Sequence, residues 1–151
     1  LAIAYQNNFV RALGQRAAAL VTRCGAQNIP IMLSPIVVAE LLCGVAEGKE
    51  TEFLQIVKKR FVSPNFDDIC SLKFAQIWRA NQERRRDLQK EGLSRNLIRM
   101  DWLIVASALA HQVEYIFSDD KHVHSCAQGL IEVRYLAEEP IPAQQESIPL
   151  E

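Results

Sequence analysis

Apolar and polar residues follow two different periods along the chain, and together they predict helices interleaved with short strands. Apolar positions that recur every three or four residues indicate helices, whereas short apolar or alternating runs indicate strands. We expect helices at 11–24, 34–46, 50–62, 67–91, 101–112 and 121–128. We expect strands at 29–33, 113–117 and 130–136. Helices and strands in this order predict a single α/β domain.

Capping residues agree with several of these limits. Ser34 followed by Pro35 is typical of a helix start, because the serine side chain accepts a hydrogen bond from a free backbone N–H and proline has none to satisfy. Asp67 or Asp68 can cap the long helix in the same way, and Gly92 can end it. The predicted helices therefore have recognisable starts and stops.

The two ends of the chain differ from its middle. Residues 1–5 (Leu-Ala-Ile-Ala-Tyr) resemble the end of a strand whose beginning lies upstream. Residues 138–151 contain three of the six prolines, and we expect an irregular tail there. The folded domain should therefore span residues 1–137.

Composition and charge exclude several classes of protein. Of the 151 residues, 17 are basic and 18 acidic, which excludes a uniformly basic nucleic-acid-binding coat and an acidic disordered chain. The four cysteines are far apart and form no C-x-x-C pair, which indicates a reducing compartment. No signal peptide is visible, and prolines and a glutamate interrupt the longest apolar stretch, 29–46. We expect a soluble, cytoplasmic protein that does not enter a membrane.

Glu40 is unusual because it is the only charged residue between 29 and 46. The helix around it is apolar on nearly every face, and such helices are usually buried. Burying a lone carboxylate is costly unless a cation pairs with it. Glu40 therefore requires a nearby cation or a helix face that opens onto water.

Asp101, Asp119 and Asp120 each have an ordinary explanation when taken alone. Asp101 opens a predicted apolar helix, where capping is common, and Asp119 and Asp120 come after a predicted strand, where aspartate turns are common. Together with Glu40, however, they place carboxylates in apolar elements and at the carboxyl end of a strand, where open α/β sheets bind ligands. Several carboxylates without a dedicated basic partner indicate a hard divalent cation, Mg²⁺ or Mn²⁺.

Two other chemistries have weaker support in the sequence. Residues 44–49 (Gly-Val-Ala-Glu-Gly-Lys) are one residue too short between the glycines for a phosphate-binding loop. The spacing His122-x-His124-x-Cys126 suits zinc, but no second cluster accompanies it.

Basic residues gather ahead of the last third of the chain. Residues 79–99 contain seven bases and three acids, whereas the chain from 101 onward contains nine acids and two bases. This asymmetry would bring phosphates beside a carboxylate–metal pocket, with Arg84, Arg85 and Arg99 as candidate substrate-binding residues. The alternative is a solvated helix face with charge pairs one turn apart.

Three segments, in this order, resemble conserved blocks of PIN-domain nucleases. Residues 34–44 (SPIVVAELLCG) resemble the second block, in which a glycine stands four positions after the acidic residue. Residues 92–111 resemble the third block, a glycine-led loop before an aspartate that opens an Ala-rich helix. Residues 115–123 (YIFSDDKHV) resemble the last block, a strand ending in Thr/Ser-x-Asp before a basic residue.

The resemblance implies a fold and an activity. It implies one three-layer α/β/α domain with a mainly parallel sheet, and a metal-dependent endoribonuclease acting on single-stranded or structured RNA. Glu40, Asp101 and Asp120 would bind the catalytic Mg²⁺ or Mn²⁺, with the Ser118 hydroxyl beside them to contact substrate. Many such proteins are VapC-type toxins, which are often homodimers and are inhibited by an antitoxin protein.

One expected residue of the family is missing from the sequence. The first acidic residue lies in a D-x-N/S motif at the end of the first strand, and residues 1–5 resemble the segment that comes directly after that motif. We expect the motif upstream. The alternative is a catalytically inactive PIN-like module that binds RNA or protein.

Overall fold

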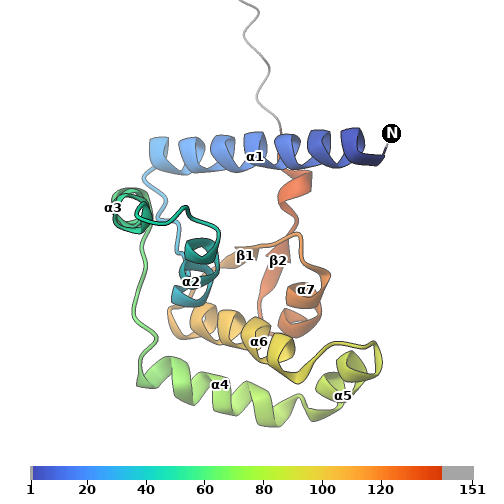
Figure 1. Cartoon of the computed structure of the whole chain (residues 1–151). Helices are drawn as coiled ribbons and strands as arrows, with labels where there is room; N and C mark the ends of the chain where they lie inside the picture. Colours follow the sequence, from blue (N-terminus) through green and yellow to red (C-terminus); the bar gives the residue numbers. More distant parts are fainter. Residues whose placement is uncertain (1, 141–151) are drawn as a thin grey trace, which may run out of the picture.

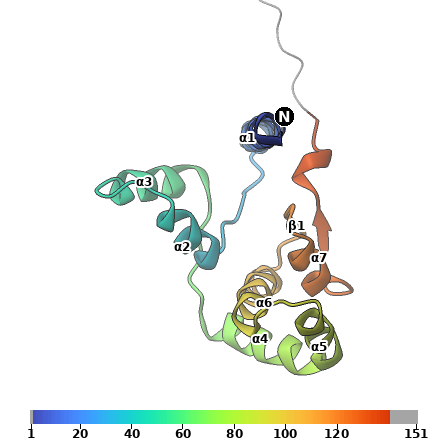
Figure 2. The same cartoon turned by 45° about the vertical axis from the view of Figure 1, so that its right-hand side comes forward.

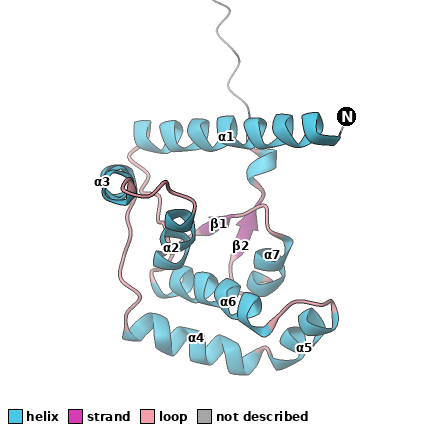
Figure 3. Ribbon diagram, in the orientation of Figure 1, coloured by secondary structure: helices cyan, strands magenta, loops and turns pink. Residues whose placement is uncertain are grey.

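The computed structural model describes residues 2–140, and this part of the chain is mostly helical (Figures 1 and 3). Helix accounts for 64% of it. The α-helices are α1 (Ala2–Ala26), α2 (Pro35–Cys43), α3 (Glu50–Arg60), α4 (Asp68–Ala80), α5 (Gln82–Lys90), α6 (Arg95–Ala110) and α7 (Lys121–Ala127). The remaining elements are the strands β1 (Tyr115–Phe117) and β2 (Glu132–Arg134) and a short 3₁₀-helix, η1 (Leu136–Glu138).

The three-layer α/β/α architecture with a mainly parallel sheet is wrong. Within residues 2–140 the sheet has only two strands, β1 and β2, which pair in parallel with Ile116 opposite Val133. So narrow a sheet cannot separate two layers of helices. The strands at 113–117 and 130–136 were therefore correctly located, but the sheet expected around them is not formed.

Two predicted strand segments do not contribute to that sheet. Residues 29–33 form one isolated parallel bridge, between Met32 and Val62. Pro30 has no N–H for a strand ladder, and the helix start at Pro35 ends the extended segment soon after the bridge. Residues 2–5, expected at the end of a strand, belong to α1, because their alanines extend the Ala-rich helix that comes next. Leu1 and residues 141–151 lie outside the described residues.

The predicted long helix at 67–91 is two helices separated at Asn81. The Asn81 side chain donates from Nδ2 to the carbonyl of Ile77 at 2.8 Å, and its backbone leaves the helical region at φ −111° and ψ 41°. Asparagine interrupts helices in this way because its side chain competes for backbone groups. The predicted start is confirmed, because Asp67 Oδ1 accepts a hydrogen bond from the N–H of Cys70 at 2.9 Å.

The predicted helix at 101–112 begins earlier than expected. Ser94 caps α6, its Oγ accepting a hydrogen bond from the N–H of Leu97 at 3.3 Å. Asp101 therefore lies in the second turn and not at the helix start. Helix capping, the ordinary explanation for an aspartate there, does not apply to it.

Helix α6 lies at the centre of the packing. Figures 1 and 2 show α4 below α6, and α2 and α7 above it. Trp102 on α6 is fully buried, as are Val105 and, from α7, Cys126. These residues belong to a hydrophobic core that draws on α4, α5, α6 and α7. Its buried members are Ile77, Leu88, Ile98, Trp102, Val105, Ala106, Cys126 and Ala127. Helix α6 therefore has two flanks, one against α4 and one against α2 and α7.

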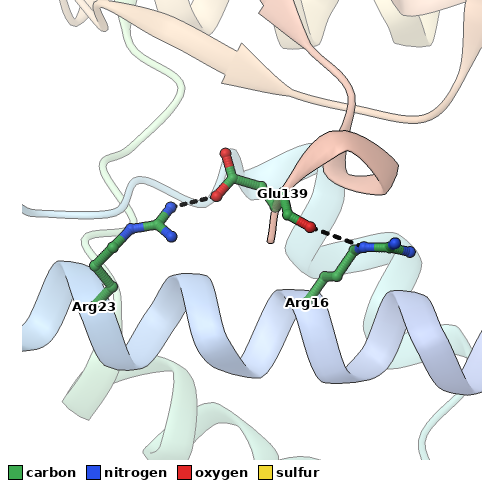
Figure 4. Close-up of polar contacts among 3 residues, drawn as sticks. All are labelled: Arg16, Arg23 and Glu139. Carbon is green, nitrogen blue, oxygen red and sulfur yellow. Dashed lines mark hydrogen bonds and ion pairs between the residues drawn. The ribbon is translucent and has the colours of Figure 1, made fainter. Parts of the chain in front are cut away.

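Helix α1 is attached to the end of the described chain (Figure 4). Arg16 Nε donates to the backbone carbonyl of Glu139 at 2.9 Å, and Arg23 forms an ion pair with the carboxylate of Glu139. One residue therefore holds two points of α1, two helical turns apart, next to η1.

Candidate active site

Asp101 is half-buried on α6, next to the fully buried Trp102. The pKa of its carboxyl is raised to about 6, mainly because burial removes water from the charged form. The negative charge of Asp120 and, to a smaller extent, that of Glu40 contribute to this rise, whereas His122 opposes it. Three carboxylates from separate elements therefore act on one another electrostatically.

Asp120 precedes α7 and caps it. Its Oδ1 accepts a hydrogen bond from the N–H of His122 at 2.8 Å, and its own N–H donates to Ser118 Oγ at 3.1 Å. The capping role is therefore real, and it accounts for one carboxylate oxygen. The Ser118 hydroxyl thus supports the turn that presents Asp120. Its predicted contact with substrate stays a prediction.

Asp119 is held in a different contact from Asp120. Its Oδ1 accepts a hydrogen bond from the N–H of Ala137 at 3.1 Å, which ties the turn after β1 to η1. The charge that raises the pKa of Asp101 is that of Asp120. The structure thus gives different contacts to two neighbouring aspartates, of which the family resemblance favoured Asp120.

Glu40 is exposed on α2. The expectation that α2 is buried is wrong, because Val38 is its one buried residue, and its face at Leu41 is 46% exposed. Glu40 therefore needs no cation to compensate for burial. Helix α2 lies above α6, on the same side as α7 (Figure 1), and the charge of Glu40 reaches Asp101.

The carboxylates match a hard divalent cation in chemistry but not as a closed three-ligand cage. In the part of the chain that the structure describes, no group of three or more His, Cys, Asp or Glu side chains is placed to hold an ion. Mg²⁺ is commonly bound through one or two carboxylates and keeps several waters. A partly hydrated site would use Asp101 and Asp120, because Asp120 affects the pKa of Asp101 more than Glu40 does.

Arg84 lies at the end of α7 opposite to the one that Asp120 caps. Its Nη1 donates to the carbonyl of Gln128 at 2.7 Å, at the end of α7. The charges of both Asp101 and Arg84 act on the buried Cys126. The pKa of its thiol is raised to about 12, mainly by burial and also by the charge of Asp101, whereas Arg84 opposes the rise. Arg84 also lines a shallow hollow of about 390 Å³ between α5 and α7.

Arg85 and Arg99 come together, but away from Asp101. Both guanidinium groups lie over the ring of Trp78 on α4, at 4.0 and 5.9 Å from its centroid. Residues two apart in a helix project about 200° apart, so Arg99 and Asp101 lie on opposite flanks of α6. Of the three predicted substrate-binding arginines, only Arg84 contacts the end of α7, the helix that Asp120 caps.

The histidines of the zinc-like spacing do not converge with Cys126. His124 stacks on Tyr135 with ring centroids 3.8 Å apart, and its Nε2 contacts the carbonyl of Ser118 at 2.7 Å. His122 lies instead beside Asp101, whose pKa it lowers. The described residues thus give no support to a zinc site there.

His122 and Trp78 each have a role that the sequence did not reveal. The spacing of His122 suggested only a zinc ligand, although its position two residues after Asp120 places it at the carboxylates. Trp78 is predicted only as part of an apolar helix face. The signal that could have indicated its role is the presence of arginines on two neighbouring helices, because these arginines supply the cations over its ring.

Comparisons with protein-family models, with curated proteins and with solved structures found no match to this chain. Among the described residues, no helix is long and apolar enough to cross a membrane.

Proposed function

We propose that this protein is a Mg²⁺- or Mn²⁺-dependent endoribonuclease whose catalytic carboxylates are Asp101, Asp120 and Glu40. The observation that supports it most is that Asp120 and Glu40 both raise the pKa of the half-buried Asp101. Such an excess of negative charge favours a cation. The resemblance of the three segments to PIN-domain blocks supports RNA as the substrate.

Each residue then has a defined part. Asp101 and Asp120 would hold the cation, which when bound activates water and neutralises charge on the phosphate. Asp101 must be ionised to do so, and Asp120 is held in place by its cap on α7. Ser118 fixes the backbone of the Asp120 loop. Arg84, across α7, attracts the RNA backbone to this side of the molecule.

Cleavage of a labelled RNA tests this function. Wild-type protein should cleave with Mn²⁺ or Mg²⁺ and not with EDTA, and Asp101→Asn should lower the rate by roughly 100-fold or more, as expected when a charge-stabilising group is lost. Asp119→Asn is the matched control, because Asp119 contacts Ala137 instead. Activity in EDTA, or full activity of Asp101→Asn, would contradict the proposal.

A catalytically inactive binding module is the second candidate function. It is favoured by the exposure of Glu40 and by the lack of a three-ligand group among the described residues. It predicts RNA binding without cleavage at millimolar Mg²⁺ or Mn²⁺. The same cleavage assay therefore separates the two candidates.

We also propose a protein partner, either a second copy of this chain or an antitoxin, and a cytoplasmic location. Large apolar side chains support the partner, because Ile69, Leu72 and Leu97 are 61%, 65% and 60% exposed. The location is supported by four free cysteines. Light scattering of the purified protein, alone and after co-expression with a neighbouring reading frame, tests both partners.

A further inference from the structure

On the flank of α6 that faces away from Asp101, aromatic rings and guanidinium groups form one stack. We call it the Trp78 cluster: Phe74, Trp78, Arg85 and Arg99 form the stack, and Arg95 belongs to it through its electrostatic effect on Arg85. The rings of Phe74 and Trp78 stack with centroids 5.4 Å apart and planes inclined by 29°. The guanidinium of Arg85 lies 4.0 Å from the Trp78 centroid, and that of Arg99 lies 5.9 Å from it. Three helices, α4, α5 and α6, contribute to the cluster.

The positive charge of the Trp78 cluster is not balanced by any ion pair of the described residues. None of the ion pairs formed within residues 13–140 includes one of its arginines. Burial lowers the pKa of Arg85, and the charges of Arg95 and Arg86 lower it further. Arg85 Nε is buried without a hydrogen-bond partner among the described residues. Repulsion between these guanidinium groups would be relieved by a bound anion.

We propose that the Trp78 cluster is a second binding surface for single-stranded RNA, separate from the carboxylates. Arg95 and Arg99 bind backbone phosphates, and an unpaired base extends the stack over the guanidinium of Arg85. Single-stranded nucleic acid is typically bound by cationic side chains combined with stacking surfaces, including arginine planes. An acidic peptide would use the charges but has no ring to continue the stack, so the cluster favours RNA.

This inference deepens the proposed function and rests on it for the choice of RNA. Arg84 and Arg85 are adjacent on α5, yet Arg84 lies by the end of α7 and Arg85 lies over Trp78. An RNA that occupies both surfaces must therefore pass over α5. The protein should thus bind extended RNA better than duplexes, whose strands cannot present unpaired bases to the stack.

Fluorescence anisotropy with a 20-nucleotide oligouridylate, measured in EDTA so that cleavage does not interfere, tests this surface. Arg85→Gln/Arg99→Gln removes the stacking plane and one phosphate contact, so it should raise the Kd about tenfold or more and lower the salt slope by about 0.7, the contribution of one contact to single-stranded phosphate. Arg85→Lys keeps the charge but not the plane, so it should weaken binding about threefold with an unchanged slope.

The matched control removes two cations elsewhere. Lys58 and Arg60 are exposed at the end of α3, which Figure 2 shows on the other side of the molecule from α4 and α5. Lys58→Gln/Arg60→Gln should change the Kd less than twofold. Near-ultraviolet circular dichroism of each variant shows whether the tryptophan environment is kept, and Arg99→Gln alone, at an exposed position, provides a second test.

Several results would overturn the proposal. One is the same Kd for wild type and Arg85→Gln/Arg99→Gln, and another is an equal loss of affinity in Lys58→Gln/Arg60→Gln. The others are an equal affinity of the wild type for a 20-base-pair duplex and for the oligouridylate, or competition by polyglutamate as strong as competition by RNA. Failure of the proposed function is a separate outcome. If wild type cleaves no RNA but its binding depends on Arg85 and Arg99, the nuclease proposal fails and this surface stands. If it cleaves and the double variant binds normally, the reverse holds.

Discussion

Asp120 raises the pKa of Asp101, although one residue precedes α7 and the other lies in the second turn of α6. The contact between α6 and α7 brings them together, and the cap at the start of α7 fixes the orientation of Asp120. A half-buried carboxylate beside a second negative charge is typical of functional sites, because folding alone does not favour it. The electrostatic effect of Asp120 on Asp101 and the stability of the helices that hold them can be tested by separate mutations.

Replacing the neighbouring charge should shift the titration of Asp101. Asp120→Asn should lower the pKa of Asp101 from about 6, because the mutation removes one of the negative charges that oppose its ionisation. Asp119→Asn should leave it unchanged, since Asp119 is held by Ala137. Carbon-13 NMR of the Asp carboxyl groups across a pH series measures both. Equal shifts in the two variants would show that the aspartates are not distinguished.

Asp101 should also make folding stability depend on pH. Its folded-state pKa of about 6 exceeds the unfolded value of about 3.9, so the folded state binds more protons between these limits. Its contribution to stability is therefore fully present below about pH 4 and is lost as the pH rises to about 6. Asp101→Asn removes this loss.

Comparing wild type with Asp101→Asn isolates the pH-dependent contribution of Asp101 to stability. Relative to wild type, Asp101→Asn should gain roughly 1–2 kcal/mol in unfolding free energy between pH 4 and pH 7.5, an amount reduced from the full shift because the group is partly solvated. Urea denaturation at both pH values measures it. A constant difference between wild type and variant would show that the pKa of Asp101 is not raised.

The start of α6 determines where Asp101 lies, so its cap should matter for stability. Ser94→Ala removes the acceptor for the N–H of Leu97 and should lower the unfolding free energy by about 1 kcal/mol. Ser94→Asp keeps an acceptor and should restore most of it. Thermal denaturation followed by circular dichroism measures both. Equal stability of Ser94→Ala and wild type would mean that α6 begins elsewhere.

The attachment of α1 should depend on the Glu139 carboxylate. Glu139→Gln removes the ion pair with Arg23 but leaves the backbone carbonyl that accepts from Arg16. We expect faster amide exchange in α1, and little change in α6, because an exposed ion pair contributes little to global stability. Hydrogen exchange with mass spectrometry resolves the two helices. Equal exchange of α1 in both proteins would show that Arg16 alone holds it.

The sequence predicted local features better than the architecture. Ser34, Pro35 and Asp67 start helices as expected, because a cap depends only on a few neighbouring residues. The sheet was overestimated, since a short apolar run such as 29–33 becomes a strand only if a partner strand lies beside it. Asn81 divided a helix through one side-chain hydrogen bond that periodicity does not register.

In the candidate site, too, local features could be predicted but the spatial arrangement could not. Its acidic residues could be selected from their apolar surroundings, but their relation depends on how α2 and α7 pack above α6. The separation of Arg99 from Asp101 follows from helix geometry once both are known to lie in α6. The helix was expected to start at 101, which left Arg99 outside it. An error of six residues in one helix start therefore changed which arginines could share a site with the carboxylates.

The pKa of Asp101 in the presence and absence of Mg²⁺, measured by carbon-13 NMR on the wild-type protein, tests the metal site most directly. Without metal we expect a value of about 6. With saturating Mg²⁺ we expect a fall of at least about two units, because the bound cation stabilises the carboxylate. The fall should disappear in Asp120→Asn. A pKa that does not change with Mg²⁺ would contradict a metal held by these carboxylates, and with it the nuclease mechanism.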